Sequence, residues 1–179
     1  MKKSKIREIT VISVFTALLV LCSWLSVPNT VPFTMQAFGV FLAATLIGKK
    51  KGTIVVAVYL GLGALGIPVF AGGKAGISAL LGQTGGYISG FLPCAFVCGA
   101  ILEKTKKSFA AMAISMTAGL LCVYICGSLW FSAMYIPKGG ESGFWTAVSA
   151  CVLPFVIPDL LKIALAAFVA GRVSQTIDF

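Results

Sequence analysis

The chain is a succession of long apolar stretches separated by short segments that are polar or rich in glycine and proline. A helix needs about 20 apolar residues to cross the hydrocarbon core of a bilayer, and several of these stretches approach that length. The pattern therefore predicts an all-α integral membrane bundle of about six transmembrane helices, in a single domain that covers residues 1–179. We expect the helices at residues 7–27, 36–48, 53–69, 85–102, 109–131 and 158–172.

The last apolar region is the least regular. Residues 144–157 are apolar but contain Pro154, and Pro158 follows directly. Proline suits the first position of a helix and disrupts the interior. We therefore expect the last helix to begin near Pro158, with residues 144–157 as a separate half-helix on the outer side. One long kinked helix that begins at Phe144 is the alternative.

Charge is sparse and unevenly placed. Charged residues make up 11% of the chain, against about 25% in soluble domains. Most basic residues fall at the start, after residue 48, after residue 103 and near the end. Because Lys and Arg beside membrane spans mark the cytoplasmic side, we expect a multi-pass protein of the cell membrane with both termini in the cytoplasm. Orientation and contact with anionic lipid explain the net charge of +9 better than binding of nucleic acid.

Two glycine motifs do not indicate nucleotide binding. Residues 61–66 match the dinucleotide fingerprint as a string, but they lie in an apolar stretch, and the chain has no acidic residue between Glu8 and Glu103. Gly73 and Lys74 are followed by Ala75, so the P-loop pattern is absent as well. Any ATP-driven step would depend on partner proteins.

The sequence does not indicate an enzyme or a metal site. The chain has no histidine, which removes the commonest general base and a common zinc ligand. A nucleophilic pairing of Ser78 or Ser89 with Lys162 stays open, but no specific motif supports it. The cysteine pairs with i,i+4 spacing are best explained as small apolar residues at helix contacts.

The most informative polar residues are Asp159 and Lys162, three positions apart in an apolar region. At that spacing the two side chains share a helix face and can pair. Charged residues within a membrane segment are costly and usually line a functional cavity. The alternative is that Asp159 stabilises a helix N-terminus through the dipole while Lys162 extends to the interface.

A second feature is the glycine-rich segment that precedes and opens the fourth helix. Gly82, Gly86 and Gly90 recur every four residues, which makes a flat helix face for close approach of another helix or a ligand. Thr84 and Tyr87 add hydrogen-bonding groups to this segment. Helix packing and ligand binding both remain open here.

Taken together, the chain resembles the BioY family, the biotin-specific S components of energy-coupling factor (ECF) vitamin transporters. The resemblance rests on residues 31–36, the glycine-rich loop, Thr84-Gly85-Gly86-Tyr87, and Asp159 with Lys162. It implies a subunit that captures biotin outside the cell with high affinity. It also implies ATP-driven uptake by partners, a transmembrane T component and two cytoplasmic ATPase subunits.

The resemblance also implies roles for individual residues. Biotin would be the transported ligand, with no cofactor, and a small-xxx-small pair on the first helix, Ser13 and Ala17, would contact the T component. The implied ligand-binding residues are Asp159, Lys162, Gln36, Ser78, Gly85, Gly86 and Tyr87. The residue before Thr84 is Gln83, where the family usually has proline.

Two other functions remain as alternatives. An S component for another vitamin would share the fold and the partners. A stand-alone proton-coupled carrier or channel would use Asp159 as the titrating group, and it would need no ATPase.

Overall fold

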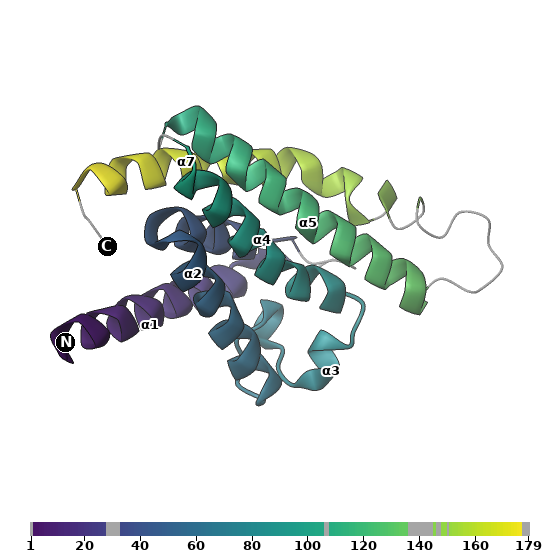
Figure 1. The fold of residues 1–179 in the computed structure, drawn as a ribbon. Coiled ribbons are helices and arrows are strands. Elements are labelled where there is room, and N and C mark those ends of the chain that lie inside the picture. The colour runs from purple at the N-terminus through teal and green to yellow at the C-terminus, as the bar shows by residue number, and fades with distance from the viewer. Residues whose placement is uncertain are drawn as a thin grey trace.

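The computed structural model describes residues 2–27, 33–105, 108–135, 145, 148–149 and 151–176. Its elements are almost entirely helical and form one bundle (Figure 1). The order is α1 (Lys2–Trp24), β1 (Ser26–Val27), β2 (Phe33–Thr34), α2 (Gln36–Ala64), the 3-10 turn η1 (Ala71–Gly73), α3 (Ile77–Leu80), α4 (Gly85–Glu103), α5 (Phe109–Tyr135) and α7 (Leu153–Thr176). The all-α class is thereby confirmed.

The helix α2 is broken at Gly48, where φ is 80° and ψ is 173°. A positive φ of this size is easily adopted only by glycine, so the break lies where the sequence permits it. The two parts correspond to the predicted helices 36–48 and 53–69. The second part ends earlier than predicted, at Ala64, because Gly66 also has a positive φ of 95° and Pro68 follows.

The predicted start of the last helix is wrong. The helix α7 begins at Leu153, and Pro158 lies inside it. Pro154 is the second residue of the helix, where its missing N–H needs no partner. Pro158 gives up only the bond that its N–H would make to the carbonyl of residue 154. Of the predicted half-helix 144–157, residues 153–157 belong to α7, while Phe144 and residues 146–147 and 150 lie outside the described residues.

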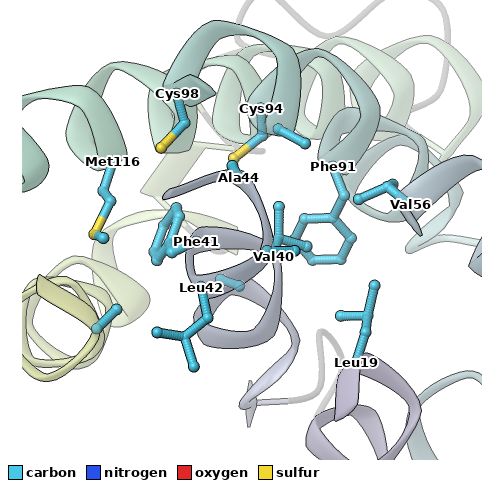
Figure 2. Packing of buried hydrophobic residues seen from close by; sticks show 14 of the residues in the cluster. Leu19, Val40, Phe41, Leu42, Ala44, Val56, Phe91, Cys94, Cys98 and Met116 are labelled. Carbon is cyan, nitrogen blue, oxygen red and sulfur yellow. The ribbon is translucent and has the colours of Figure 1, made fainter. Parts of the chain in front are cut away.

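The core lies where α2 is enclosed by its neighbours. The most extensive helix packing joins α4 with α5, followed by α2 with α4 and α1 with α2, while α7 covers α2 and α5. Figure 2 shows Val40 and Phe41 of α2 in the middle of this core, with Leu19 of α1, Cys94 of α4 and Met116 of α5 around them. All five side chains are fully buried.

Four helices are long and apolar enough to cross a membrane: Lys5–Trp24, Gly85–Glu103, Phe109–Met134 and Leu153–Gln175. The two parts of α2 are each shorter than a full span. Large apolar side chains such as Ile114, Leu121 and Ile125 of α5 are exposed on the bundle surface. Such a surface suits contact with lipid, as expected for a multi-pass membrane protein.

The basic segments of the chain gather at one end of the bundle. The first residues of α1 and the last residues of α7 lie on the same side of the molecule (Figure 1). Lys49, next to the break in α2, forms an ion pair with Glu103 at the end of α4, with 3.0 Å between Nζ and Oε2. That this end faces the cytoplasm stays a prediction.

Candidate ligand cavity

A cavity lies between the first part of α2, the beginning of α4, the second half of α5 and the beginning of α7. The loop around η1 contributes Ala71 to its wall, and most of the wall is apolar. Few polar side chains reach it, so each of them bears on what the cavity can bind. The polar residues of the wall are Thr34, Gln36, Thr84, Tyr87, Tyr124, Asp159 and Lys162.

Asp159 and Lys162 form a buried ion pair in this wall. The Lys162 Nζ donates to Asp159 Oδ1 at 2.7 Å. Lys162 is only 5% exposed and Asp159 only 6%. Asp159 lies well inside α7, so stabilisation by the helix N-terminus does not explain it. Lys162 stays buried rather than extending to the interface. The structure thus favours a functional cavity over the alternative that rests on the dipole and an extended lysine.

Tyr124 of α5 completes the polar group around Asp159. Its hydroxyl donates to Asp159 Oδ2 at 2.6 Å, so each oxygen of the carboxylate accepts a strong hydrogen bond. Tyr124 is not among the binding residues predicted from the sequence. The available signal was a tyrosine in the middle of an otherwise apolar stretch, where a hydroxyl needs a partner.

The short β-hairpin places an aromatic side chain against the ion pair. Lys162 Nζ lies 4.1 Å from the ring centroid of Phe33 in β2, a cation–π arrangement. Phe33 in turn stacks on Phe155 of α7, with centroids 6.4 Å apart and an interplanar angle of 19°. The hairpin therefore covers one side of the ammonium group and limits its access to water.

Gln36, at the start of α2, is 4% exposed and held by two neighbours. Its Nε2 donates to the hydroxyl of Tyr59 at 2.6 Å, and its Oε1 accepts from Thr34 Oγ1 at 3.0 Å. The amide of Gln36 is thereby held at both ends. One N–H of Gln36 is left over for a ligand in the cavity.

Tyr87 lies in the first turn of α4 and is 8% exposed. Its ring packs directly on Gly127 of α5, where a Cβ would come within 2.1 Å of the ring. Tyr87 also lines the cavity, and its contact with a ligand stays a prediction.

Gly85 and Gly86 do not line the cavity but support its wall. A Cβ on Gly86 would lie 2.2 Å from Trp130 Cβ, and one on Gly85 would lie 1.8 Å from the carbonyl oxygen of Leu80. On Gly90 it would approach Val123 Cα to 3.0 Å. The glycine face of α4 thus allows close packing on α5 and α3. For these glycines the structure supports helix packing, the first of the two interpretations left open.

Ser78 is not brought together with the ion pair. It is exposed on α3 and borders a separate polar depression with Lys74, Gln83 and Thr84. Thr84 borders both the depression and the cavity. The depression therefore adjoins the cavity at the beginning of α4.

Ser13 and Ala17 are exposed on α1 and are not among the residues that line the cavity. They border an apolar groove whose other side is formed by Val58 and Leu62 of α2. Because the side chains of Ser13 and Ala17 are small, the backbone of another helix can approach α1 closely at this position.

Within the described residues, no three His, Cys, Asp or Glu side chains are grouped so that they could hold a metal ion. All six cysteines are free thiols. The polar groups of the cavity wall are the ion pair, the two tyrosines, the amide of Gln36 and the hydroxyls of Thr34 and Thr84.

Known proteins resemble this chain along nearly its full length. A biotin transporter BioY from Thermotoga maritima is 43% identical over 170 residues, which cover 94% of this chain and 96% of the relative. One from Rhodobacter capsulatus is 34% identical over 179 residues, covering 94% of each. A crystal structure of the S-component for biotin from an ECF-type ABC transporter matches with a TM-score of 0.89 and 28% identity, over 100% of this chain and 96% of that one. A sequence model of the BioY family matches residues 1–179, and the chain therefore belongs to the BioY family.

Proposed function

We propose that this chain is the biotin-binding S component of an ECF transporter, which captures biotin outside the cell for ATP-driven uptake by partner subunits. The observation that carries the proposal is the buried group of Asp159, Lys162 and Tyr124 in an otherwise apolar cavity. Relatives named as biotin transporters and a solved biotin S component with the same fold support it. A family of transporters also agrees with the expectation that the chain is not an enzyme.

The ion pair suits the ureido group of biotin better than its carboxylate. Asp159 and Lys162 neutralise each other at 2.7 Å, so the pair favours a neutral polar group over a second buried anion. The carboxylate of Asp159 keeps lone pairs that can accept ureido N–H groups, and the ammonium group keeps two N–H donors for the ureido carbonyl. One ligand group thus satisfies both members of the pair.

The other proposed binding residues act in different ways. Gln36 offers its remaining amide N–H to the ligand. Gly85 and Gly86 contribute by holding α4 against α5 and α3, which positions Thr84 and Tyr87. Ser78, in the polar depression next to the cavity, contacts the ligand where it enters.

The groove at Ser13 and Ala17 is the proposed contact for the T component. It combines two small residues with an apolar floor formed by Val58 and Leu62. Since the chain lacks the P-loop pattern, two cytoplasmic ATPase subunits, joined through the T component, would supply the energy.

Calorimetric titration of biotin into the detergent-purified chain, without partner subunits, tests the proposal. We expect tight one-to-one binding that Asp159→Asn and Lys162→Ala weaken by at least tenfold. The matched control is Glu103→Gln, which removes the carboxylate charge from the exposed pair of Lys49 and Glu103 and should bind like the wild type. Absence of binding by the folded wild type would contradict the proposal, and riboflavin and thiamine in the same titration would test the alternative vitamins.

Co-purification tests the partner contact. Ala17→Leu fills the groove on α1 and should reduce recovery of the T component and the ATPases with the tagged chain. Ile114→Leu, on the exposed face of α5, is the control for a change at the lipid surface. Equal recovery with both variants would contradict the assignment of the groove.

A further inference from the structure

The polar depression beside the cavity is large enough to admit a small molecule. Its volume is about 420 Å³, within the range of small-molecule sites. Its polar side chains are those of Lys74, Ser78, Gln83 and Thr84, and none of the residues that line it is acidic. Because Thr84 also lines the cavity, a molecule in the depression is one side chain away from the cavity.

Lys74 carries an isolated positive charge at this end of the bundle. Apart from it and the buried pair, the charged residues that the structure describes lie in the first turns of α1, just after the break in α2, at the end of α4 or in the last turns of α7. The two ends of α4, Gly85 beside the depression and Glu103 beside Lys49, are about 27 Å apart at 1.5 Å per residue. Lys74 is exposed, and no carboxylate of the described residues forms an ion pair with it.

Backbone contacts hold the walls of the depression in place. On one side, the Lys74 carbonyl accepts a hydrogen bond from the N–H of Phe70 at 3.1 Å, and the Phe70 side chain is only 1% exposed. On the other side, Trp130 Nε1 of α5 donates to the Gly82 carbonyl at 3.0 Å. The loop that carries Lys74 and the segment that leads into α4 are therefore both tied to the bundle, and the depression is formed before a ligand arrives.

The depression and the cavity differ in what they offer to an anion. In the cavity wall Lys162 is already paired with Asp159 at 2.7 Å, so its charge is neutralised before any ligand binds. In the depression the charge of Lys74 has no such partner among the described residues. An alkyl carboxylic acid such as biotin is ionised at neutral pH, and a charge of opposite sign at the mouth of a site raises the rate at which a charged ligand arrives.

We propose that the depression is an entry site for anionic ligands, in which Lys74 attracts the carboxylate of biotin from solution before the ligand passes Thr84 into the cavity. The inference rests on the proposed function, because it takes the ligand to be biotin. Lys74 acts on the encounter and not on the ligand once it is bound. It therefore raises the association rate for an anion and leaves the dissociation rate unchanged.

Surface plasmon resonance on the immobilised, detergent-purified chain tests the entry site, with biotin and its neutral carboxamide as ligands. At low salt, Lys74→Ala should slow the association of biotin about threefold and Lys74→Glu about tenfold. Both differences should vanish at high salt, where the charges are screened. The association rate of the carboxamide and the dissociation rates of both ligands should match those of the wild type.

Lys50→Glu is the matched control. It makes the same change in net charge as Lys74→Glu, at another exposed lysine that lies beside the break in α2, and it should leave the association of biotin unchanged. Equal slowing by both variants, equal slowing for the carboxamide, or a faster dissociation of biotin from the Lys74 variants would overturn the entry site. Unchanged association in Lys74→Glu at low salt would overturn it as well, whereas a folded wild type that binds neither ligand would overturn the proposed function and the entry site together.

Discussion

Among the residues that the structure describes, two lysine–carboxylate ion pairs have nearly equal lengths but very different surroundings. Lys162 and Asp159 are 2.7 Å apart, with side chains that are 6% and 8% exposed. Lys49 and Glu103 are 3.0 Å apart, with side chains that are 41% and 45% exposed. The first pair lies in the cavity wall, and the second joins the break in α2 to the end of α4.

This difference shows why only one of the pairs indicates function. Water already stabilises the charges of Lys49 and Glu103, so their pairing contributes about 0–1 kcal/mol. Burial of Lys162 and Asp159 costs several kcal/mol per ion, which their attraction need not repay. The buried pair therefore depends on Tyr124 and on the Phe33 ring, and ligand binding gives a reason to keep it.

Removing one member of the buried pair should have the largest effect. Lys162→Ala leaves the Asp159 carboxylate buried without its cation, and we expect unfolding to become easier by about 3–5 kcal/mol along with the loss of biotin binding. Thermal unfolding in detergent and calorimetry measure the two effects. A melting temperature equal to that of the wild type would contradict the description of the pair as buried.

Removing both charges of the buried pair separates its contribution to stability from its contribution to binding. In the double variant Asp159→Leu with Lys162→Met, no unpaired charge remains, so stability should return to within about 1–2 kcal/mol of the wild type or exceed it. Biotin binding should stay lost, because donor and acceptor are both gone. Recovery of binding in this variant would show that the pair is only structural.

Loss of the hydrogen bond from Tyr124 to Asp159 should have the next largest effect. Tyr124→Phe keeps the ring but removes the donor to Asp159 Oδ2, and a hydrogen bond to a charged group contributes about 1.5–3 kcal/mol. We expect a lower melting temperature and weaker biotin binding than in the wild type, both smaller changes than in Lys162→Ala. The outcome that speaks against this role is an unchanged affinity in the folded variant.

A smaller effect is expected at the neutral network beside the pair. Tyr59→Phe removes the acceptor of Gln36 Nε2 and should cost about 1 kcal/mol. Biotin affinity should fall severalfold, because the amide of Gln36 can then reorient. Calorimetry at a temperature where the variant and the wild type are both folded measures the affinity. An affinity that falls further than in Tyr124→Phe would mean that Gln36, rather than the ion pair, dominates binding.

The exposed pair should give the smallest effect. Glu103→Gln should change stability by less than about 1 kcal/mol, and this small difference should shrink further in high salt. The measurement is thermal unfolding at low and high salt. A large loss of stability that persists in salt would show that the two pairs are more alike than their exposure indicates.

Much of the fold and part of the site could be predicted from the sequence. Residues 85–102 and 109–131 match α4 and α5 closely, since long apolar runs between polar breaks report membrane helices directly. The start of α7 could not be located in the same way, because proline is tolerated both in the first turn and, as at Pro158, further in when packing compensates for the lost bond. The ion pair of Asp159 and Lys162 could be predicted from their spacing, since both residues lie on the same helix.

The membrane location, the helical class and the local pairing of Asp159 with Lys162 can be inferred from the amino-acid pattern, because they depend on hydrophobicity and on spacing within one segment. The surroundings of that pair become visible only in the folded bundle. Tyr124 is 35 positions away from Asp159, and Phe33 reaches Lys162 from the other end of the chain. Contacts of this kind depend on how separate helices pack, which no pattern within a single segment encodes.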